Sequence, residues 1–358
     1  MNNQKRILFV LDSLKYKENE NVYKKEFSQE YISDFYYTDY ENRLVRFLHG
    51  ISGIGSFLSL ISYWILSLIS AGDLFLNKRK QYDSKVFINP IVGVFYCFLL
   101  VLFNKNDKVS IAGFLFVPKK NKVYFALRKY FVRFSYKKSS IIIVYSKSEV
   151  LFYSECFPTL ALKFKFVRYG RDYDLFEKKT FKSETSYIAS GGVSNRDYNT
   201  LACAMEILKK RQSDLHCKIV TRPGYLSLKC HPSNLEILYN IRIDAFGSFL
   251  KNSMFVVIPL KNIIISAGHM SLLEAMFRGK TILVTDIPSI RDYVDDEMVF
   301  FYKPDDPSDL ADKIEYLSNN LMDKAVIQKS IYAKSVFLST YCFIPFLKRI
   351  VSEVDKVM

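Results

Sequence analysis

The sequence is poor in the residues that build metal and disulfide sites. Its 358 residues include four histidines and six cysteines, and no two cysteines form a C-x-x-C pair. No Cys/His group has the spacing of zinc ligands, so we expect no metal site. The six cysteines are therefore interpreted as reduced, mostly buried thiols of a cytosolic protein. A polar start that runs directly into the apolar residues 7–11 also predicts no signal peptide.

Charged residues are missing from a long apolar run at residues 50–72. The run is long enough to span a bilayer, but serines recur along it, mostly three to five residues apart. Small polar residues would then line one side of a helix and large apolar residues the other. This favours an amphipathic helix, packed on protein or lying in a membrane interface, with a true span as the alternative. The apolar side comprises Phe57, Leu58, Ile61, Trp64, Ile65 and Leu68.

A second apolar run, residues 86–103, is interrupted by Asn89 and Pro90. Asparagine is a favoured helix cap, and proline is favoured at the first helical position. This run is therefore predicted to be a short buried strand followed by a capped, buried helix.

The length of the chain predicts its number of domains, and its net charge predicts the kind of partner it binds. The chain is too long for one ordinary domain and suits two, and 49% of its residues are hydrophobic, enough for two cores. A formal net charge of +15 predicts acidic partners, namely nucleic acid, anionic lipid or phosphorylated small molecules.

Short apolar strands alternate with helical patterns in both halves of the chain. This alternation predicts α/β folding, with parallel sheets covered by helices on both faces. A polar stretch at residues 177–185 interrupts the pattern, which then restarts. We predict an N-terminal domain over 1–178, a C-terminal domain over 179–340 and a terminal helix, 341–358. Open α/β sheets bind ligands beyond the carboxyl ends of their strands.

The block at residues 266–280 has the pattern of an anion site. Gly268 permits a tight turn, while Ser271 and Glu274 have capping-box spacing, which predicts a helix that begins at Ser271. The N-terminus of such a helix attracts a diphosphate, and Glu274 could accept hydrogen bonds from ribose hydroxyls. Alternatively, Glu274 only caps the helix and Gly268 only makes a turn.

A second block, residues 188–198, follows a predicted strand and opens a predicted helix. Gly191 and Gly192 allow a ligand to approach the backbone, and Arg196 can pair with phosphate oxygens. A surface ion pair between Arg196 and Asp197 is the alternative. Arg222, just after the next strand, is a candidate second cation.

The segment over residues 266–312 resembles the donor-binding signature of glycosyltransferase family 4. The resemblance includes residues 286–294 and 303–311. It implies that Glu274 grips the ribose of the donor. The acidic residue that the family places eight positions earlier is replaced here by Ser266, whereas His269 stands at a position that is Gln-like in one branch. We predict donor contacts at Ser266, Gly268, His269, Met270, Ser271 and Leu272.

The first half resembles the family only in its α/β pattern, and its lone His49 is interpreted as incidental. Residues 119–138 hold eight basic residues, no acidic residue and six aromatic residues. Such a helix suits an anionic membrane surface, with Arg128, Lys129 and Arg133 as predicted contacts. Nucleic-acid binding or a merely solvated helix are the alternatives; we expect no nucleic-acid partner.

The resemblance implies a GT-B fold, with two Rossmann-like domains facing across a cleft. It further implies a metal-independent, cofactor-free, usually retaining sugar transfer from a nucleotide-diphosphate donor. We expect a lipid-linked or glycan acceptor, a role in cell-surface glycan synthesis, and a cytoplasmic protein held at the inner face of the membrane. A nucleotide-sugar epimerase and a catalytically silent scaffold are the alternatives.

Overall fold

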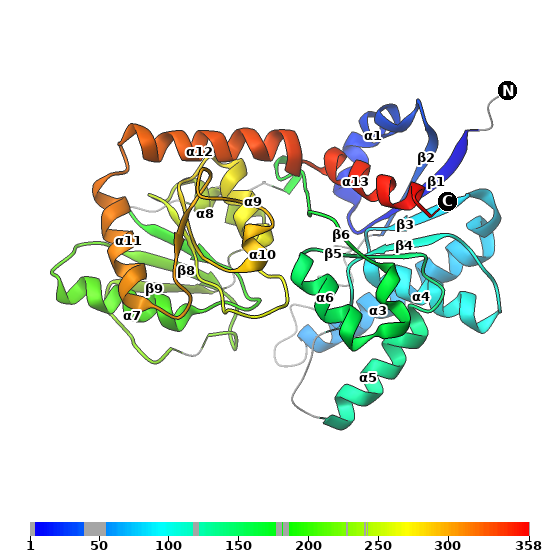
Figure 1. Ribbon diagram of the computed structural model, residues 1–358, viewed down its shortest axis with the longest axis horizontal. Helices are drawn as coiled ribbons and strands as arrows, with labels where there is room; N and C mark the ends of the chain where they lie inside the picture. Colours follow the sequence, from blue (N-terminus) through cyan, green and yellow to red (C-terminus); the bar gives the residue numbers. More distant parts are fainter. Residues whose placement is uncertain are drawn as a thin grey trace. The chain divides into compact units, whose positions relative to one another are not determined.

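A computed structural model of the protein describes residues 4–38, 55–116, 122–176, 181, 186–226, 228–239, 241 and 243–357. The chain divides into two compact units, residues 1–167 with 347–358, and residues 168–346. Each unit holds its own six-stranded sheet (Figure 1). The predicted linker at 177–185 lies, except for residue 181, outside the described part of the chain, as does His49.

The sheet of the first unit is parallel throughout. Residues 7–11 and all of the third, fourth and fifth strands are buried, as expected of strands covered on both faces. The spatial order is β2-β1-β3-β4-β5-β6. The strands are β1 (Lys5–Leu11), β2 (Tyr31–Tyr37), β3 (Ser84–Phe87), β4 (Val109–Ala112), β5 (Ile141–Val144) and β6 (Phe164–Phe166).

Local capping sets where the helices of this unit begin. Asn89 accepts hydrogen bonds from the Ile91 and Val92 amides, and Pro90 is the first residue of its helix, so the predicted strand, cap and helix are confirmed. At the start of α6 the Ser146 hydroxyl accepts from the Glu149 amide at 3.1 Å, and the Glu149 carboxylate accepts from the Tyr145 amide at 3.0 Å. The helices are α1 (Glu20–Phe27), α3 (Gly55–Asp73), α4 (Pro90–Leu102), α5 (Lys122–Ser135) and α6 (Lys147–Cys156).

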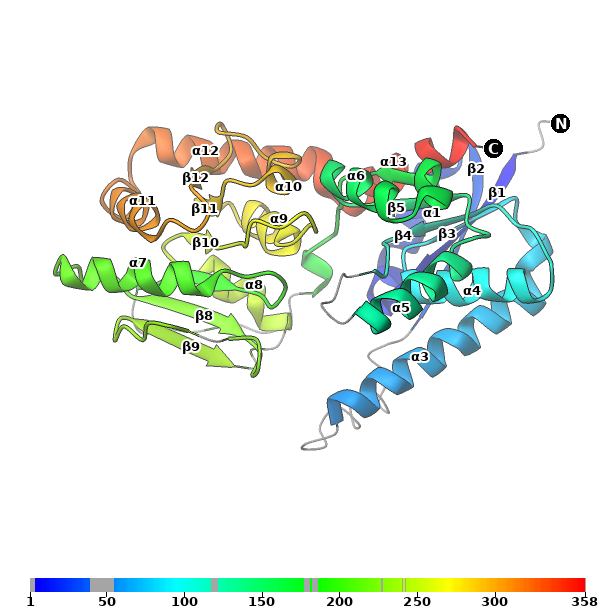
Figure 2. The same cartoon turned by 60° about the horizontal axis from the view of Figure 1, so that its bottom comes forward.

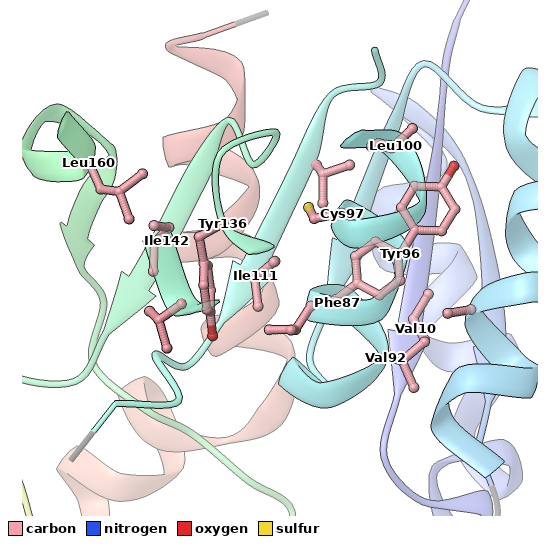
Figure 3. Close-up of a cluster of buried hydrophobic side chains, with 14 of the residues drawn as sticks. Val10, Phe87, Val92, Tyr96, Cys97, Leu100, Ile111, Tyr136, Ile142 and Leu160 are labelled. Atoms are coloured by element: carbon pink, nitrogen blue, oxygen red, sulfur yellow. The ribbon is translucent and has the colours of Figure 1, made fainter. Parts of the chain in front are cut away.

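Side chains from β1, β3, β4, β5 and the neighbouring helices form the core of the first unit (Figure 3). Helix α4 lies close to the sheet at Gly93, where a Cβ would come within 2.9 Å of the Phe87 Cβ. Tyr136 is fully buried, and its hydroxyl donates to the Gly113 carbonyl at 3.1 Å. The buried phenol is thus tolerated because its polar atom has a partner.

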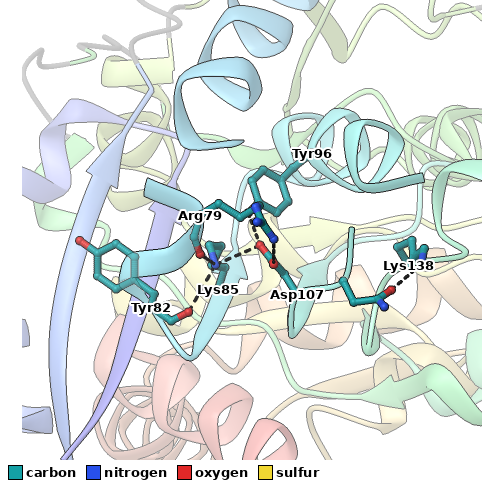
Figure 4. A network of polar contacts seen from close by, with 7 residues as sticks. Arg79, Tyr82, Lys85, Tyr96, Asp107 and Lys138 are labelled. Atoms are coloured by element: carbon teal, nitrogen blue, oxygen red, sulfur yellow. Dashed lines mark hydrogen bonds and ion pairs between the residues drawn. The ribbon is translucent and has the colours of Figure 1, made fainter. Parts of the chain in front are cut away.

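A polar network includes Tyr96, which is also a residue of this core (Figure 4). The side chain of Lys85 is only 1% exposed, and its Nζ lies 3.2 Å from the Asp107 carboxylate and donates to the Arg79 carbonyl at 2.8 Å. Tyr96 also donates to Asp107. Burial lowers the pKa of Lys85, so the neighbouring carboxylate is what keeps the ammonium charge tolerable.

The substitution Asp107→Asn is expected to destabilise the first unit by about 3–5 kcal/mol, because it leaves the buried Lys85 charge without its counter-ion. Denaturant unfolding followed by tryptophan fluorescence checks this, since Trp64 is the only tryptophan and belongs to the first unit. The double variant Lys85→Met/Asp107→Leu should recover part of the loss. An unchanged midpoint in Asp107→Asn would show that the pair contributes nothing.

The second unit repeats the architecture with a second parallel sheet. Its order is β12-β11-β10-β7-β8-β9, from β7 (Ile188–Gly191), β8 (Cys217–Thr221), β9 (Leu235–Tyr239), β10 (Val256–Ile258), β11 (Ile282–Thr285) and β12 (Phe300–Tyr302). Its helices are α7 (Tyr198–Lys210), α8 (Ile243–Lys251), α9 (His269–Phe277), α10 (Pro288–Arg291), α11 (Pro307–Asn319) and α12 (Lys324–Val336). The predicted pair of parallel α/β folds is confirmed.

The last helix, α13 (Phe343–Asp355), begins in the second unit, and residues 347–358 belong to the first. Within the first unit, Lys348 pairs with Glu26 of α1 at 2.7 Å, and the Tyr31 hydroxyl of β2 donates to Asp355. These contacts tie the C-terminal residues to the first sheet and its helix. All six cysteines are free thiols, although the Sγ atoms of Cys203 and Cys230 lie 3.0 Å apart.

Candidate functional site

The site begins at the two glycines that end β7. At Gly191 a Cβ would come within 2.5 Å of the Phe246 ring of α8. Gly192 has φ +124°, a backbone angle that side chains rarely adopt, and a Cβ there would meet the guanidinium of Arg196 at 2.4 Å. Both positions therefore need glycine, and the turn lets Arg196 fold back over the end of its own strand.

The guanidinium of Arg196 is held by neutral partners. Its Nε donates to the Gly191 carbonyl at 3.0 Å and its Nη2 to the Ser271 hydroxyl at 2.8 Å. Its Nη1 is buried and has no hydrogen-bond partner. A buried guanidinium nitrogen without a partner is costly, and an oxyanion is the partner that its geometry fits.

The alternative of an ion pair with Asp197 is wrong. Asp197 accepts from the Thr200 amide at 3.2 Å and so caps α7. Among the described residues, Arg196 forms no ion pair with any carboxylate. Burial lowers the pKa of Arg196, although its charge is retained. A cation that is desolvated and lacks a counter-ion is expected where a charged ligand binds.

Helix α9 begins earlier than the predicted Ser271, at His269, and Gly268 precedes it with φ +83°. The predicted capping box at Ser271 and Glu274 is therefore wrong. The Ser271 hydroxyl instead accepts from Arg196, so the guanidinium lies at the first turn of α9. A Cβ at Gly268 would come within 3.0 Å of Nη1. The first-turn amides of a helix lack intrahelical partners, so a fixed cation and a positive helix end meet here.

Glu274 lies one turn further along α9 and is largely buried. Its side chain is 13% exposed and pairs at 3.7 Å with Arg278, which is 7% exposed. Its Oε1 lies 2.6 Å from the position of a Cβ at Gly247, the residue after Phe246. Because Phe246 also covers Gly191, α8 connects the acidic group to the glycine turn. The carboxylate is therefore positioned by packing and by Arg278, and it does not cap the helix.

The ring of the predicted His269 contacts Ser289 and Tyr293. Its Nε2 donates to the Ser289 carbonyl at 3.1 Å, and its ring packs on Tyr293 with centroids 4.2 Å apart. Burial lowers its pKa to about 4, with a further contribution from the Arg196 charge. The ring is therefore neutral at physiological pH and joins α9 to α10.

Acid is expected to destabilise the second unit through His269. Its pKa is about 4 when folded and about 6.5 when unfolded, so the unfolded state binds the extra proton between these values. Stability should fall by about 3 kcal/mol as the pH drops from 6.5 to 4. Hydrogen exchange of the β7 amides at several pH values measures this. His269→Gln should flatten the profile, and an equally steep profile in that variant would contradict the assignment.

The other predicted donor residues differ in how exposed they are to solvent. Met270 is exposed and its carbonyl accepts from Tyr173 at 2.8 Å, whereas Ser266 is half-buried and Arg222 is exposed. Leu272 is fully buried, and its amide donates to the Gly268 carbonyl within the helix. Its side chain and its amide therefore serve the fold and do not face a ligand. The structure thus brings together Gly191, Gly192, Arg196, Gly268 and Ser271.

Two polar residues of this cluster were not predicted. Tyr198 and Thr221 both donate to the Gly192 carbonyl, at 2.7 and 3.1 Å, and so fix the glycine turn. Thr221 ends the neighbouring strand β8, just before the predicted Arg222. Thr221 could have been predicted from the sequence, because a polar residue at the carboxyl end of an apolar strand lies where such sheets bind ligands.

The three predicted membrane contacts on α5 differ from one another. Arg128 donates to the Leu115 carbonyl at 3.2 Å, and the Lys129 ammonium lies 5.6 Å from the centre of the Phe157 ring. Only Arg133 is exposed, beside the exposed Leu127 and Tyr130. Arg128 and Lys129 therefore also hold α5 to its own unit.

The described residues contain no group of three or more histidine, cysteine or acidic side chains that could hold a metal ion. Residues 185–320, which contain the whole cluster, match the family described as "Glycosyl transferases group 1". None of the curated proteins matches the chain.

Solved structures resemble the whole chain. The Anabaena protein Alr3699/HepE in complex with UDP-glucose has a TM-score of 0.61 at 12% identity, covering 99% of this chain and 100% of that one. A glycosyltransferase from Rickettsia africae has 0.59 at 13%, covering 99% of both. Sucrose-phosphate synthase from Thermosynechococcus elongatus has 0.63 at 11%, also covering 99% of both. The chain therefore has the GT-B fold, and residues 185–320 in its second unit match the group 1 glycosyltransferase family.

Proposed function

We propose that the protein transfers a sugar from a nucleoside-diphosphate donor to an acceptor. The observation that carries the proposal is the guanidinium of Arg196, which lies at the first turn of α9 without a carboxylate partner and with Nη1 unbonded. A diphosphate would supply both the counter-charge and the missing hydrogen-bond acceptor.

The charge at this site suits the leaving group of such a reaction. Negative charge grows on the diphosphate as the bond to the sugar breaks, so a fixed cation there stabilises the transition state more than the ground state. Glu274 would accept hydrogen bonds from the ribose. A UDP-sugar is the first donor to test, because the resembling Anabaena protein was solved with UDP-glucose.

The finer features follow the resemblance of the sequence to family 4. We propose a retaining transfer in which the leaving phosphate helps to take the acceptor proton, so that neither a side-chain nucleophile nor a metal is needed. The acceptor would be lipid-linked or a glycan, bound by the first unit, in the synthesis of cell-surface glycans. A location at the inner face of the membrane would bring the enzyme to such an acceptor.

Thermal unfolding with UDP-, GDP-, ADP- and TDP-sugars, each with and without EDTA, tests donor binding. A ligand at 100 times its Kd adds about 2.7 kcal/mol of stability. We expect one nucleotide class to stabilise the protein equally in EDTA. Failure of all four classes would overturn the proposal.

A turnover assay separates the proposal from its alternatives. The stabilising donor is incubated with and without a sugar-bearing polyprenyl diphosphate, and the products are analysed by mass spectrometry. Transfer to the lipid supports the proposal. Conversion of the donor sugar into its epimer without acceptor would instead indicate an epimerase, and binding without any turnover of the donor would indicate a silent scaffold.

A further inference from the structure

Helix α3 has its polar side turned inward. Ser67, Ala71 and Leu74, in or just after this helix, are fully buried in the first unit. The opposite side is exposed along its length, with between 40% and 62% of each side chain accessible: Leu60, Ile61, Trp64, Ile65, Leu68 and Ile69. A helix on the surface of a water-soluble protein has the reverse arrangement.

The serines of the buried side do not require water. The Ser67 hydroxyl donates to the Tyr63 carbonyl at 2.7 Å, and the Ser62 hydroxyl donates to the Leu58 carbonyl at 2.9 Å. Small, internally bonded residues let α3 pack closely on the unit, where Trp64 meets Phe95 of α4 edge to face at 6.0 Å. The inward turn of the serines therefore leaves only large apolar side chains facing out.

The exposed side is apolar and uncharged. Residues 47–72 contain no Asp, Glu, Lys or Arg. The helical stretch Leu60–Gln81 is long and apolar enough to cross a membrane, and most of it is not buried in the protein. Contiguous apolar surface of this kind on a folded unit marks a contact with a partner or a membrane.

The charges around this surface favour an anionic partner. Helices α3 and α5 flank α4 (Figure 2), and the three helices contain a single acidic residue, Asp73, which accepts a hydrogen bond from Asn77. Helix α5 has basic residues and no acidic residue, and Arg133 among them is exposed. It also exposes Leu127, Tyr130 and Phe131. An apolar face beside acid-free basic and aromatic residues is the composition of a helix that lies in a lipid interface.

We propose that α3 lies in the plane of an anionic bilayer, with its outer side inserted at the boundary of the acyl chains and with α5 at the rim. Ser67, Ala71 and Leu74 hold α3 to the core, so it cannot leave the unit to span the bilayer. A two-fold contact between copies would bring the basic rims of both together, which disfavours a second copy as the occupant. The proposal extends the proposed membrane location, and its test needs no donor or acceptor.

The protein carries its own probe of this contact, because Trp64 is its only tryptophan and is 46% exposed on the proposed face. The purified chain is mixed with vesicles of phosphatidylcholine and phosphatidylglycerol that contain lipids brominated near the headgroup or near the bilayer centre. We expect a blue shift and stronger quenching by the shallow bromines. Stronger quenching by the deep bromines would indicate a span, because Trp64 lies near the middle of α3, and no spectral change would mean no insertion. Either outcome overturns the proposal.

Variants on the outer side complete the test. Ile65→Ser/Ile69→Ser should weaken vesicle binding at least about tenfold. Roughly half of each isoleucine is exposed, and the variant loses the free energy of burying this apolar surface in lipid. The matched control is Leu162→Ser, a side chain that is 92% exposed on another part of the unit. Equal binding by the double variant and the control would overturn the proposal. The proposal would also be overturned if sedimentation showed a dimeric wild type and a monomeric double variant while both bound vesicles equally.

Salt and lipid composition identify the role of charge. Binding should be weaker to pure phosphatidylcholine and should fall as salt rises, because electrostatic attraction is screened over about 8 Å at physiological ionic strength. Arg133→Glu should reduce this salt dependence while leaving donor binding in the second unit unchanged. If binding is the same for neutral and anionic vesicles at all salt concentrations, the anionic part of the proposal is wrong.

Discussion

Replacing Arg196 with alanine is expected to lower kcat by roughly 10²–10³-fold, with a much smaller change in KM for the donor. The guanidinium lies at the first turn of α9, where the diphosphate is proposed to bind. Charge on that diphosphate is greatest in the transition state, so the cation acts mainly on the rate. Initial rates over a range of donor concentrations, with saturating acceptor, give both constants.

The controls for this prediction use other basic side chains. Arg211→Ala removes a surface arginine at the far end of α7 that pairs with Asp312 and Glu315, and it should leave the rate unchanged. Arg196→Lys keeps the charge but loses the planar fork that bonds Gly191 and Ser271, so an intermediate rate is expected. An effect of Arg196→Ala on KM alone, with kcat intact, would contradict the proposed role.

The variant Glu274→Gln is expected to reduce kcat/KM on the order of 100-fold while the protein still folds. A hydrogen bond from a ribose hydroxyl to a charged carboxylate is worth roughly 1.5–3 kcal/mol. Glutamine keeps the size of the side chain beside Gly247 but lacks the charge. Binding of UDP and of its 2′-deoxy analogue is compared for both proteins by calorimetry. The wild type should prefer UDP clearly, and Glu274→Gln should not.

The ion pair with Arg278 is the competing explanation for any effect at Glu274. If the carboxylate serves only to neutralise Arg278, the double variant Glu274→Gln/Arg278→Met should recover both stability and activity. If it binds the ribose, the double variant should recover stability but remain slow. Restored turnover in the double variant would therefore reject the ribose role.

Where the decisive information lay within a few residues, the sequence predicted the structure. Asn89 and Pro90 set the start of α4 by a local cap, and the glycine pair and Arg196 fall within six residues at the end of one strand. The strand β2 was not predicted, because it is an edge strand with a buried Ser33 and with Asp34, which pairs with Arg6 of its neighbour. Its apolar pattern is therefore weak.

The spacing of Ser271 and Glu274 was misleading for a similar reason. A serine three residues before a glutamate predicts a capping box only if no stronger partner competes for the hydroxyl. Here Arg196, 75 residues earlier in the chain, takes the Ser271 hydroxyl, and the left-handed Gly268 starts the helix sooner. Ser146 and Glu149 have the same spacing, and there the serine hydroxyl does cap the helix by accepting from the Glu149 amide.

The sequence by itself determined the parallel α/β class of both halves, the glycine turn and the presence of a basic, acid-free segment. These features depend on the periodicity and composition of neighbouring residues. The tertiary structure alone decided that the Arg196 guanidinium meets the start of α9 without a carboxylate, and that the apolar side of α3 faces outward. Both depend on contacts between segments far apart in the chain, because a helix carries two faces in its sequence and only packing selects which one is buried.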